Sequence, residues 1–564
     1  MARTVAIGEQ NFEEIIQKNC FYIDKTMFIK EWWESRDSVT LITRPRRFGK
    51  TLNMSMLEYF FSVEHAGQGR LFDGLAIWQE EEYRQMQGTY PVISLSFARV
   101  KDTRLEDAIE RIREIIRSAF RKKQFLRDSD VLAAEEKAYF DRILSDKASE
   151  VDVTSSLYHL SDYLYRYYGK KVIILLDEYD TPMQEAYLGN YWDGLTAFTR
   201  SLFNSAFKTN PYLARGIMTG ITRVSKESIF SDLNHLEVVT TTSNKYTAVF
   251  GFTEEEVFTA LDEYGLSKDK EIVKYWYDGF TFGKQKDIYN PWSIINLLDK
   301  GEIGVYWANT SSNSLAGKLL REGNRDIKEM FEILLKGESL KTQIEEQIVY
   351  NQLGNSAAAV WSLLLASGYL KVLDCQTIIN GYDREWHYEL AITNHETRRM
   401  FEGMVSDWFR NVDYDYNEFI KAMLADDIDM MNLYMNRVAL NSFSCFDTGN
   451  RPSDIEPERF YHGFVLGLLV DLQKEYVITS NRESGFGRYD VMIEPKDVSG
   501  KAAVILEFKV MNERREATLE DTVQAALRQI EEKQYAAQLM ARGFPKERIR
   551  YYGFAFRGKE ILIG

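Results

Sequence analysis

Two short stretches of this chain carry residue types that together can hold a polyphosphate. Residues 44–51 read Arg-Pro-Arg-Arg-Phe-Gly-Lys-Thr, and residues 172–180 read Val-Ile-Ile-Leu-Leu-Asp-Glu-Tyr-Asp. In the first stretch, backbone amides at the start of a helix and the ammonium of Lys50 can bind phosphate oxygens. The hydroxyl of the next residue, Thr51, can be a ligand of Mg²⁺. These residue types at this spacing indicate a phosphate-binding loop.

The second stretch supplies the acids that such a loop needs for hydrolysis. Asp177 and Glu178 follow an apolar run with the composition of a buried strand. Asp177 can hold the metal shell, and Glu178 can orient or deprotonate the attacking water. The alternative is a strand that ends in two solvated acids. Because both halves of the pattern are present, we favour a site that binds and hydrolyses ATP with Mg²⁺.

The loop departs from the pattern G-x-x-x-x-G-K-[ST] at one position, because Arg44 stands where the first glycine is expected. Loss of that glycine restricts the turn through which backbone approaches phosphate. The flanking residues support the loop, since residues 38–43 are rich in β-formers and residues 52–61 have helical apolar spacing. We therefore predict that the whole loop binds the nucleotide, through Arg44, Pro45, Arg46, Arg47, Phe48, Gly49, Lys50 and Thr51.

The composition describes a folded, acidic chain of several domains. A chain of 564 residues is too long to fold around a single hydrophobic core. Its apolar content of 45% and its 9 prolines argue against long disordered linkers. A net charge of −15 gives no overall attraction to nucleic acid or membrane, although a local groove would suffice for nucleic acid. The scattered cysteines and histidines predict no disulfide framework and no zinc site. Without a signal peptide or a run long enough to span a membrane, we expect a cytoplasmic protein.

Strands and helices alternate through the first part of the chain. Alternation of this kind predicts a parallel sheet covered by helices on both faces. One predicted strand lies between the loop and the acidic strand in the sequence, which favours an additional-strand ATPase core over a kinase-like one. The predicted strands are residues 39–43, 91–97, 171–176, 213–219 and 236–241.

The rest of the chain changes character twice. After residue 245 it becomes helical, notably at residues 254–263 and 269–277, and we expect a helical lid beside the nucleotide. A connecting helical region follows, with a short β-pair near residues 369–375 and 385–392. The predicted domains are a P-loop core at 1–245, the lid at 246–320, the connecting region at 321–445 and an α/β domain at 446–564.

The C-terminal segment carries a second set of charged residues. Two β-rich runs contain Asp490 in the first, and Glu507 and Lys509 in the second. Glu507 and Lys509 are two residues apart and therefore project from one face of a strand. Asp490 and Glu507 could bind one or two Mg²⁺ ions, and Lys509 could position the nucleophile or offset charge. The alternative is a hairpin with solvated charges, but unpaired charges are costly in a run that otherwise looks buried.

Several motifs resemble the bacterial AAA-ATPase-like family. They occur at residues 21–26, 44–51, 176–180, 219–228, 275–280, 289–293 and 306–310, which read FYIDKT, RPRRFGKT, LDEYD, TGITRVSKES, YWYDGF, YNPWS and YWANT. That family commonly ends in a PD-(D/E)xK nuclease-like domain, which residues 480–490 (SNRESGFGRYD) and the Glu507-Phe-Lys509 triplet resemble. The resemblance spans nearly the whole chain and is weakest across residues 315–440.

The resemblance implies that the arginine-containing loop is the family's own version of the phosphate loop. It also implies that the C-terminal domain is nuclease-like and acts on DNA or RNA. Asp490, Glu507 and Lys509 would then be the metal ligands and the lysine of that fold, with Gln529 on the following helix as an accessory residue. Glu458, near the start of an apolar helix, is the nearest candidate for a further acid.

Thr219 and Arg223 lie at and just after the strand that we expect beside the acidic strand. Thr219 could orient water, and Arg223 could sense the γ-phosphate; the alternative is that Arg223 pairs with Glu227 or Asp232. Because one chain shows no unambiguous arginine finger, we expect hydrolysis to need a neighbouring subunit or an activating partner, with Arg223 and Arg215 as the first arginines to test.

Two classes of function stay open. The first is an ATP-driven switch tethered to a metal-dependent nuclease, in defence, mobile-element or repair settings. The second is a nucleotide-dependent signalling or scaffold protein whose nuclease-like domain binds nucleic acid or a partner without cleavage. A substrate-directed kinase is disfavoured, because Glu178 beside Asp177 suits activation of water. Asp24 and Lys25 are expected to pack the N-terminal segment rather than border the nucleotide.

Overall fold

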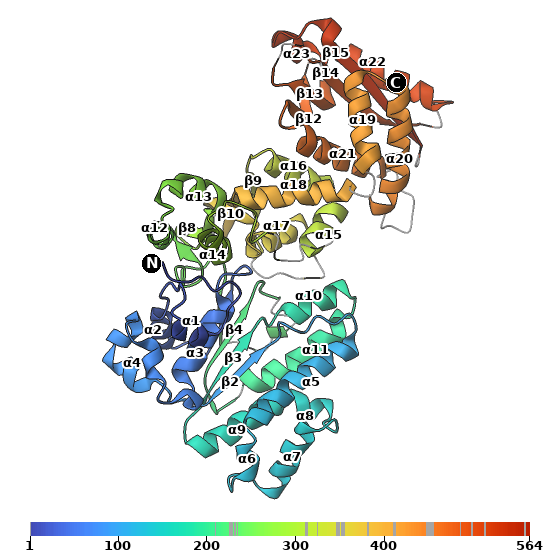
Figure 1. Cartoon of the computed structure of the whole chain (residues 1–564). Coiled ribbons are helices and arrows are strands. Elements are labelled where there is room, and N and C mark those ends of the chain that lie inside the picture. Colours follow the sequence, from blue (N-terminus) through green and yellow to red (C-terminus); the bar gives the residue numbers. More distant parts are fainter. Residues whose placement is uncertain are drawn as a thin grey trace. The chain divides into compact units, whose positions relative to one another are not determined.

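The computed structural model describes residues 2–564 with the exception of short segments. These are residues 209, 225–228, 231–232, 234, 309, 311–313, 324, 346–349, 351–352, 354–355, 381–382, 410–412, 447–455, 485–486, 498–499, 513–514 and 558–559. The chain forms two compact units (Figure 1). The N-terminal unit comprises Met1–Ser312 and Lys341–Thr397, and the C-terminal unit comprises Asn313–Leu340 and Arg398–Gly564.

A five-stranded parallel sheet forms the centre of the N-terminal unit. Its strands are β1 (Val39–Thr43), β2 (Val92–Ser96), β3 (Val172–Asp177), β4 (Leu213–Gly220) and β5 (Leu236–Val239). They lie in the order β2-β3-β4-β1-β5. β4 therefore separates β1, which leads into the phosphate loop, from β3, which ends in Asp177. The predicted strands and the predicted additional-strand topology are both confirmed.

Burial explains why these segments are strands of a parallel sheet. β1 and β3 read VTLIT and VIILLD, and every residue of both strands is buried, as expected where helices cover both faces. Figure 1 shows helices on either side of this sheet. The helices of this part of the chain are α1 (Phe12–Gln17), α2 (Met27–Glu34), α3 (Lys50–Phe61), α4 (Glu81–Met86), α5 (Leu105–Lys122), α6 (Phe125–Asp128), α7 (Ala134–Leu144), α8 (Glu150–Thr154), α9 (Ser156–Tyr168), α10 (Thr181–Leu188) and α11 (Trp192–Phe203).

Residues 252–300 form a smaller layer of helices and short strands. The helices α12 (Glu254–Glu263), α13 (Lys270–Tyr277) and α14 (Pro291–Lys300) share a buried apolar core. An antiparallel sheet of order β6-β8-β7 joins them, from β6 (Phe252–Thr253), β7 (Phe280–Phe282) and β8 (Gln285–Tyr289). The sequence predicts the first two helices but not the strands, because each strand has only two to five residues and β8 begins with exposed polar ones.

The second stretch of the N-terminal unit adds a helix and a hairpin. The helix is α17 (Ala357–Ala366). β10 (Leu370–Asn380) and β11 (Asp383–Ile392) pair antiparallel, and β9 (Leu340–Gln343) lies on the other side of β11. This hairpin is the β-pair predicted near residues 369–375 and 385–392.

A second five-stranded sheet organises the C-terminal unit. Its strands are β12 (Tyr476–Ser484), β13 (Gly487–Pro495), β14 (Ala503–Val510), β15 (Ile549–Arg557) and β16 (Glu560–Ile563), in that order. β14 and β15 are parallel and the other neighbours are antiparallel. The two β-rich runs predicted around Asp490 and around Glu507 and Lys509 correspond to β13 and β14, which are neighbours in this sheet.

The helices of the C-terminal unit come from both of its stretches. They are α15 (Ser314–Glu322), α16 (Arg325–Leu335), α18 (His395–Phe409, from Arg398 onward), α19 (Asp413–Ala425), α20 (Ile428–Phe446), α21 (Glu456–Leu472), α22 (Leu519–Glu532) and α23 (Ala537–Ala541). Across the described ranges of the whole chain, no helix combines the length and the apolar character needed to cross a membrane.

Candidate functional sites

The phosphate loop joins the end of β1 to the start of α3. Gly49 immediately precedes the helix with a φ of 79°, a left-handed conformation that glycine adopts without strain. Because α3 begins at Lys50, the amides of its first turn have no carbonyl partner within the helix. These amides and the helix dipole favour an anion at the loop.

Lys50 is held across the loop by backbone carbonyl groups. It is 6% exposed, and its Nζ donates to the carbonyl of Arg44 at 2.9 Å and to that of Pro45 at 2.8 Å. Burial lowers the pKa of Lys50, and the carboxylates of Glu178 and Asp177 act in the opposite direction. A buried ammonium held only by neutral carbonyls would gain by exchanging them for charged phosphate oxygens.

Asp177 connects the phosphate loop to the central sheet. Its Oδ2 accepts a hydrogen bond from Thr51 Oγ1 at 2.6 Å, and its Oδ1 accepts one from Thr219 Oγ1. Burial raises the pKa of Asp177, whereas the two hydroxyl donors lower it. Three of the predicted residues, from α3, β3 and β4, therefore meet at the carboxyl edge of the sheet, where ligands of open α/β sheets bind.

Glu178 is the first residue after β3 and has a φ of 51°, an uncommon conformation for a residue other than glycine. Its amide donates to Thr219 Oγ1 at 3.4 Å, and its Oε2 accepts from Thr181 Oγ1 at 3.1 Å. Backbone strain of this kind tends to occur at functional sites. Here it turns the chain from β3 toward α10, at the point where Glu178 lines a cavity.

That cavity has a volume of about 450 Å³ and lies against the phosphate loop. Its polar lining includes Arg46, Arg47, Lys50, Thr51, Asp177, Glu178, Thr181 and Gln184. Its apolar lining comes from the N-terminal segment and from residues 252–295, and includes Val5, Phe21, Ile23, Phe252, Trp292 and Ile295. A ligand that combines a polyphosphate with a flat, largely apolar ring system matches both kinds of lining.

Arg46 and Arg47 both line the cavity but have different partners. Arg46 is half-buried and donates from Nη2 to Oε1 of Gln184 at 3.2 Å. Arg47 is exposed, and its guanidinium lies 4.4 Å from the ring centre of Trp292. The backbone carbonyl of Arg46 accepts from Trp307 Nε1 at 3.0 Å. This bond fixes the backbone of the loop while leaving both side chains at the cavity.

Arg44 differs from the prediction that the whole loop contacts the nucleotide. Its guanidinium is fully buried, donates to the carbonyls of Thr240 at 2.7 Å and Lys245 at 3.2 Å, and lies 4.5 Å from the ring centre of Phe282. Burial lowers the pKa of Arg44 to about 9. Neither Arg44 nor the adjacent Pro45 belongs to the described cavity lining. Arginine replaces glycine here because its guanidinium satisfies carbonyl groups that follow β5.

Arg215 does not fit the role of an arginine finger. Its guanidinium donates to the carbonyls of Asp37 and Trp33, both at 2.6 Å. It lies near the start of β4, whereas Thr219 lies near the end of that strand. Arg215 therefore ties β4 to the chain that precedes β1, at the edge of the sheet away from the cavity.

Arg223 lies beside Tyr179 rather than in the cavity lining of the described residues. Burial raises the pKa of Tyr179, and the charge of Arg223 opposes that effect. Glu227 and Asp232, the alternative partners of Arg223, lie outside the described residues.

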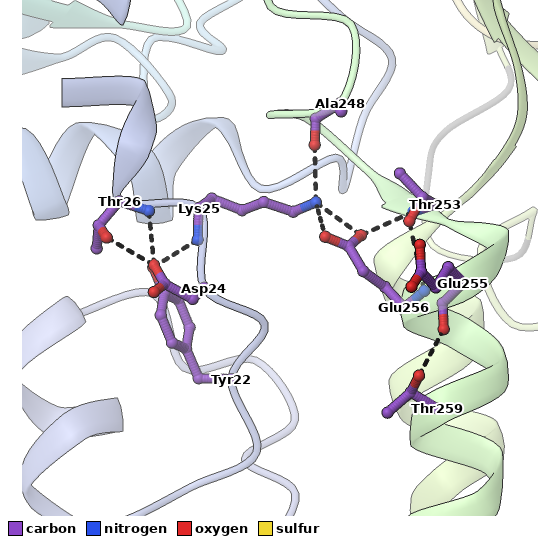
Figure 2. A network of polar contacts seen from close by, with 9 residues as sticks. All are labelled: Tyr22, Asp24, Lys25, Thr26, Ala248, Thr253, Glu255, Glu256 and Thr259. Carbon is purple, nitrogen blue, oxygen red and sulfur yellow. Dashed lines mark hydrogen bonds and ion pairs between the residues drawn. The ribbon is translucent and has the colours of Figure 1, made fainter. Parts of the chain in front are cut away.

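Lys25 has a second role besides the packing that the sequence predicts, because it also lines the cavity. Its Nζ lies 2.6 and 2.7 Å from the two carboxylate oxygens of Glu256 and 2.7 Å from the carbonyl of Ala248 (Figure 2). The neighbouring Asp24 accepts from the amide and the hydroxyl of Thr26, at 2.8 and 2.6 Å. The ion pair fastens the N-terminal segment to the first turn of α12. Sequence spacing could not reveal it, since the partners are 231 residues apart.

Asp180 is a further residue at this edge whose role the sequence does not show. Its Oδ2 accepts from the amides of Ile221 at 3.0 Å and Thr222 at 2.8 Å, and from Thr222 Oγ1 at 2.8 Å. Burial raises the pKa of Asp180, and these donors oppose the rise. A side chain at Gly220 would lie 2.6 Å from Asp180 Oδ1, so the close approach requires glycine. Asp180 therefore fastens the end of β3 to the end of β4.

Thr51 and Asp177 fit a Mg²⁺ ion beside a bound nucleotide. Both line the cavity, and their oxygens lie 2.6 Å apart. Mg²⁺ takes oxygen ligands and is commonly bound by one or two protein groups together with substrate phosphates. A cation would also stabilise the charged form of Asp177, which burial disfavours.

The second predicted site lies on β13 and β14. Their register pairs Val491 with Leu506, the neighbours of Asp490 and Glu507. Asp490 Oδ2 accepts from the amide of Phe508 at 2.8 Å. Glu507 is 3% exposed, and burial, followed by the charge of Asp490, raises the pKa of Glu507 to about 8. The two carboxylates are therefore close enough to interact electrostatically.

Gln529 of α22 bridges the charged groups of β14. Its Nε2 donates to Glu507 Oε1 and, at 3.1 Å, to the hydroxyl oxygen of Tyr535. Its Oε1 accepts from Lys509 Nζ at 2.7 Å. Glu507 and Lys509 thus meet the same amide, as expected for residues on one face of the strand. Tyr535 is buried beside them, and no spacing rule in the sequence singles it out.

The chemistry of this second site fits a divalent cation. Glu507 Oε2 is buried and has no hydrogen-bond partner among the described residues. A cation beside two carboxylates would relieve their repulsion and replace that missing partner. Within the described ranges, no cluster of three or more His, Cys, Asp or Glu side chains could hold a metal. The side chain of Glu458, at the start of α21, lies outside the described part.

Comparison with known proteins places both sites within recognised domains. The family model described as "Predicted AAA-ATPase" matches residues 6–230, and the PD-(D/E)XK nuclease superfamily matches residues 456–564. A curated relative from Azotobacter chroococcum mcd 1, described as "Uncharacterized protein in vnfD 5'region", is 25% identical over 382 residues. That alignment covers 67% of this chain and spans 65% of the relative's length. The chain therefore combines an N-terminal region that matches the predicted AAA-ATPase family with a C-terminal region that matches the PD-(D/E)XK nuclease superfamily.

Proposed function

We propose that the protein is an ATP-binding and ATP-hydrolysing switch coupled to a metal-dependent nuclease that acts on DNA or RNA. The observation that carries the proposal is the gathering of Lys50, Thr51, Asp177 and Glu178 around one cavity at the carboxyl edge of a parallel sheet. This set contains a phosphate-binding cation, two oxygen ligands for a metal and a general base.

Each residue of the nucleotide site has a separate task. Lys50 and the amides at the start of α3 bind phosphate oxygens. Thr51 and Asp177 would hold Mg²⁺, which when bound offsets the charge of the β- and γ-phosphates. Glu178 accepts a proton from the attacking water. Thr219 is hydrogen-bonded to the carboxylate of Asp177 and to the amide of Glu178, and it thereby fixes the position of the two acids relative to each other.

Two substitutions separate binding from hydrolysis. Lys50→Ala should weaken ATP binding by about tenfold to a hundredfold, because it removes charge-assisted hydrogen bonds. Glu178→Gln should preserve binding but hydrolyse ATP slowly, because an amide cannot accept the proton of water. Calorimetry measures the first effect and phosphate release the second. Equal ATP affinity of the wild type and Lys50→Ala would contradict the assignment of this site.

In the nuclease-like domain, the proposal assigns metal binding to Asp490 and Glu507. A bound divalent ion supplies activation of water and stabilisation of the phosphate charge. Lys509, held by Gln529 at 2.7 Å, positions the nucleophile or offsets charge beside the scissile phosphate. The raised pKa of Glu507 and its unpaired oxygen support a site that gains stability when a cation binds.

The full-length protein provides the test of cleavage, with labelled single- and double-stranded DNA and RNA, with and without Mg²⁺, Mn²⁺ and ATP. Glu507→Ala should lose both metal binding and cleavage. Lys509→Ala should bind metal but cleave slowly. Full activity of Glu507→Ala would remove the metal assignment, and a cleavage rate unaffected by ATP would remove the coupling. Nucleic acid bound but uncut under every condition would instead support the nucleotide-dependent scaffold.

A further inference from the structure

Arg46 combines a fixed backbone with a weakly held side chain. Its carbonyl accepts from Trp307 Nε1 at 3.0 Å and from Asn290 Nδ2 at 3.3 Å, so the peptide is held at the cavity from two directions. Its guanidinium lines the cavity and makes a single described side-chain hydrogen bond, to the neutral amide of Gln184 at 3.2 Å. One bond to an amide is a weak restraint for a group that prefers bidentate contact with oxyanions.

Three of the other arginines described above make contacts elsewhere. Arg44 and Arg215 donate hydrogen bonds to backbone carbonyls, and a ligand in the cavity would not break these bonds. Arg47 lies over the ring of Trp292, on the apolar part of the cavity lining. Arg46 therefore differs from these three in having both access to the cavity and a partner that is easily exchanged.

The surroundings of Arg46 place it on the side of the cavity where hydrolysis would occur. Its partner Gln184 lies on α10, the helix that follows Glu178. Burial lowers the pKa of Lys50, and the charge of Arg46 adds to that effect, so the two cations lie near each other. Asp177 and Glu178 line the same cavity and contribute negative charge. A triphosphate would bring more negative charge to this point than Lys50 alone can offset.

We propose that Arg46 exchanges Gln184 for the γ-phosphate of bound ATP and acts as an arginine finger supplied by the phosphate loop itself. This inference rests on the proposed ATPase function. In the reaction, the oxygen of water bonds to the γ-phosphorus, the bond from that phosphorus to the bridging oxygen of ADP breaks, and Glu178 takes the proton of the water. Arg46 donates to the γ-phosphate oxygens and stabilises the charge that spreads over them. No finger from a second subunit is then required.

The test compares ATP with ADP, because only ATP carries the group that Arg46 would contact. Affinities are measured by calorimetry on the full-length protein, and turnover by phosphate release, for Arg46→Ala, Arg46→Lys and Arg47→Ala. Arg46→Ala should lower the preference for ATP over ADP by about tenfold or more and lower kcat by about a thousandfold. Arg46→Lys should recover part of both effects. Arg47→Ala, the matched control, should change ATP and ADP affinity by the same factor.

The possible results separate this inference from the proposal on which it rests. Failure of the wild type to bind either nucleotide would overturn both. Binding by the wild type with an unchanged ATP-to-ADP preference in Arg46→Ala would overturn the role of Arg46 alone, as would equal losses for ATP and ADP. If the isolated wild type binds ATP without hydrolysing it, the ratio of ATP affinity to ADP affinity, compared between the wild type and Arg46→Ala, decides whether Arg46 contacts the γ-phosphate. Thermal unfolding of each variant shows that losses in affinity do not reflect loss of the fold.

Discussion

Replacing Arg44 with glycine would restore the common phosphate-loop pattern, yet we expect the variant to be less stable than the wild type. Arg44 is not among the described residues with positive φ, so its backbone does not require glycine. Its guanidinium donates to the carbonyls of Thr43, Thr240 and Lys245 and lies over Phe282. Glycine would leave the three carbonyls without these donors in a buried place, where unsatisfied polar groups are costly.

The size of the effect follows from opposing contributions. Loss of three charge-assisted hydrogen bonds costs roughly 6 kcal/mol, loss of the ring contact about 2 kcal/mol, and loss of three buried methylene groups about 2.5 kcal/mol. Burial lowers the pKa of Arg44 from its ordinary value to about 9, so removal of the charge recovers about 5 kcal/mol of desolvation. The net loss of stability is about 5.5 kcal/mol, a large fraction of the stability of a typical domain.

Denaturant unfolding followed by tryptophan fluorescence measures this loss in the full-length protein. Arg44→Lys is the graded control, because it keeps a cation and a donor but not the planar fork, and it should lose less than Arg44→Gly. Thermal unfolding with and without ATP shows whether binding is impaired as well. If Arg44→Gly were as stable as the wild type and bound ATP equally well, the contacts of Arg44 would not explain why arginine stands at this position.

Four further substitutions test how the cavity is held together. Gly220→Ala should lower the thermal unfolding midpoint, because its Cβ would lie 2.6 Å from Asp180 Oδ1; an unchanged midpoint would mean that the two strand ends are not in tight contact. Lys25→Met should weaken ATP binding by separating the N-terminal segment from α12, and Glu256→Gln added to it should cost little more, which a double-mutant cycle measures. Trp307→Phe removes the indole donor to the loop and should cost about 1 kcal/mol in stability, with normal stability and normal ATP affinity counting against this anchor.

The sequence predicts the central sheet well because the residue types of each strand agree with its buried position in the fold. β1 and β3 are continuous runs of buried apolar and β-branched residues, and turn or cap residues follow each of them. The strands of the smaller layer carry no such signal, since β6 has two residues and β8 begins with Gln285, Lys286 and Asp287. Those strands depend on packing against residues distant in the sequence, which residue pattern alone does not reveal.

In the candidate sites too, local motifs predict some side-chain positions, whereas others depend on residues distant in the sequence. The side chains of Lys50, Thr51 and Asp177 could be assigned because motifs at strand ends dictate where they lie. The orientation of the Arg44 side chain could not be predicted from the sequence, because the carbonyls of Thr240 and Lys245 that it contacts follow β5, about two hundred residues further along the chain. The bridge formed by Gln529 likewise depends on how α22 lies beside β14.

The division of the chain into interleaved units has a consequence for the order in which a newly made protein can fold. The N-terminal unit has all of its residues once residue 397 has been synthesised. The other unit must wait, because Glu332 of α16 accepts from Ser480 Oγ, and Asn432 of α20 bonds to both the amide and the carbonyl of Ile563, each at 2.8 Å. The nascent chain can therefore complete its nucleotide-binding unit before the acidic pair near its end is assembled. A prematurely terminated chain would contain the first unit without the second, so incomplete synthesis would not produce the proposed nuclease without the proposed ATPase.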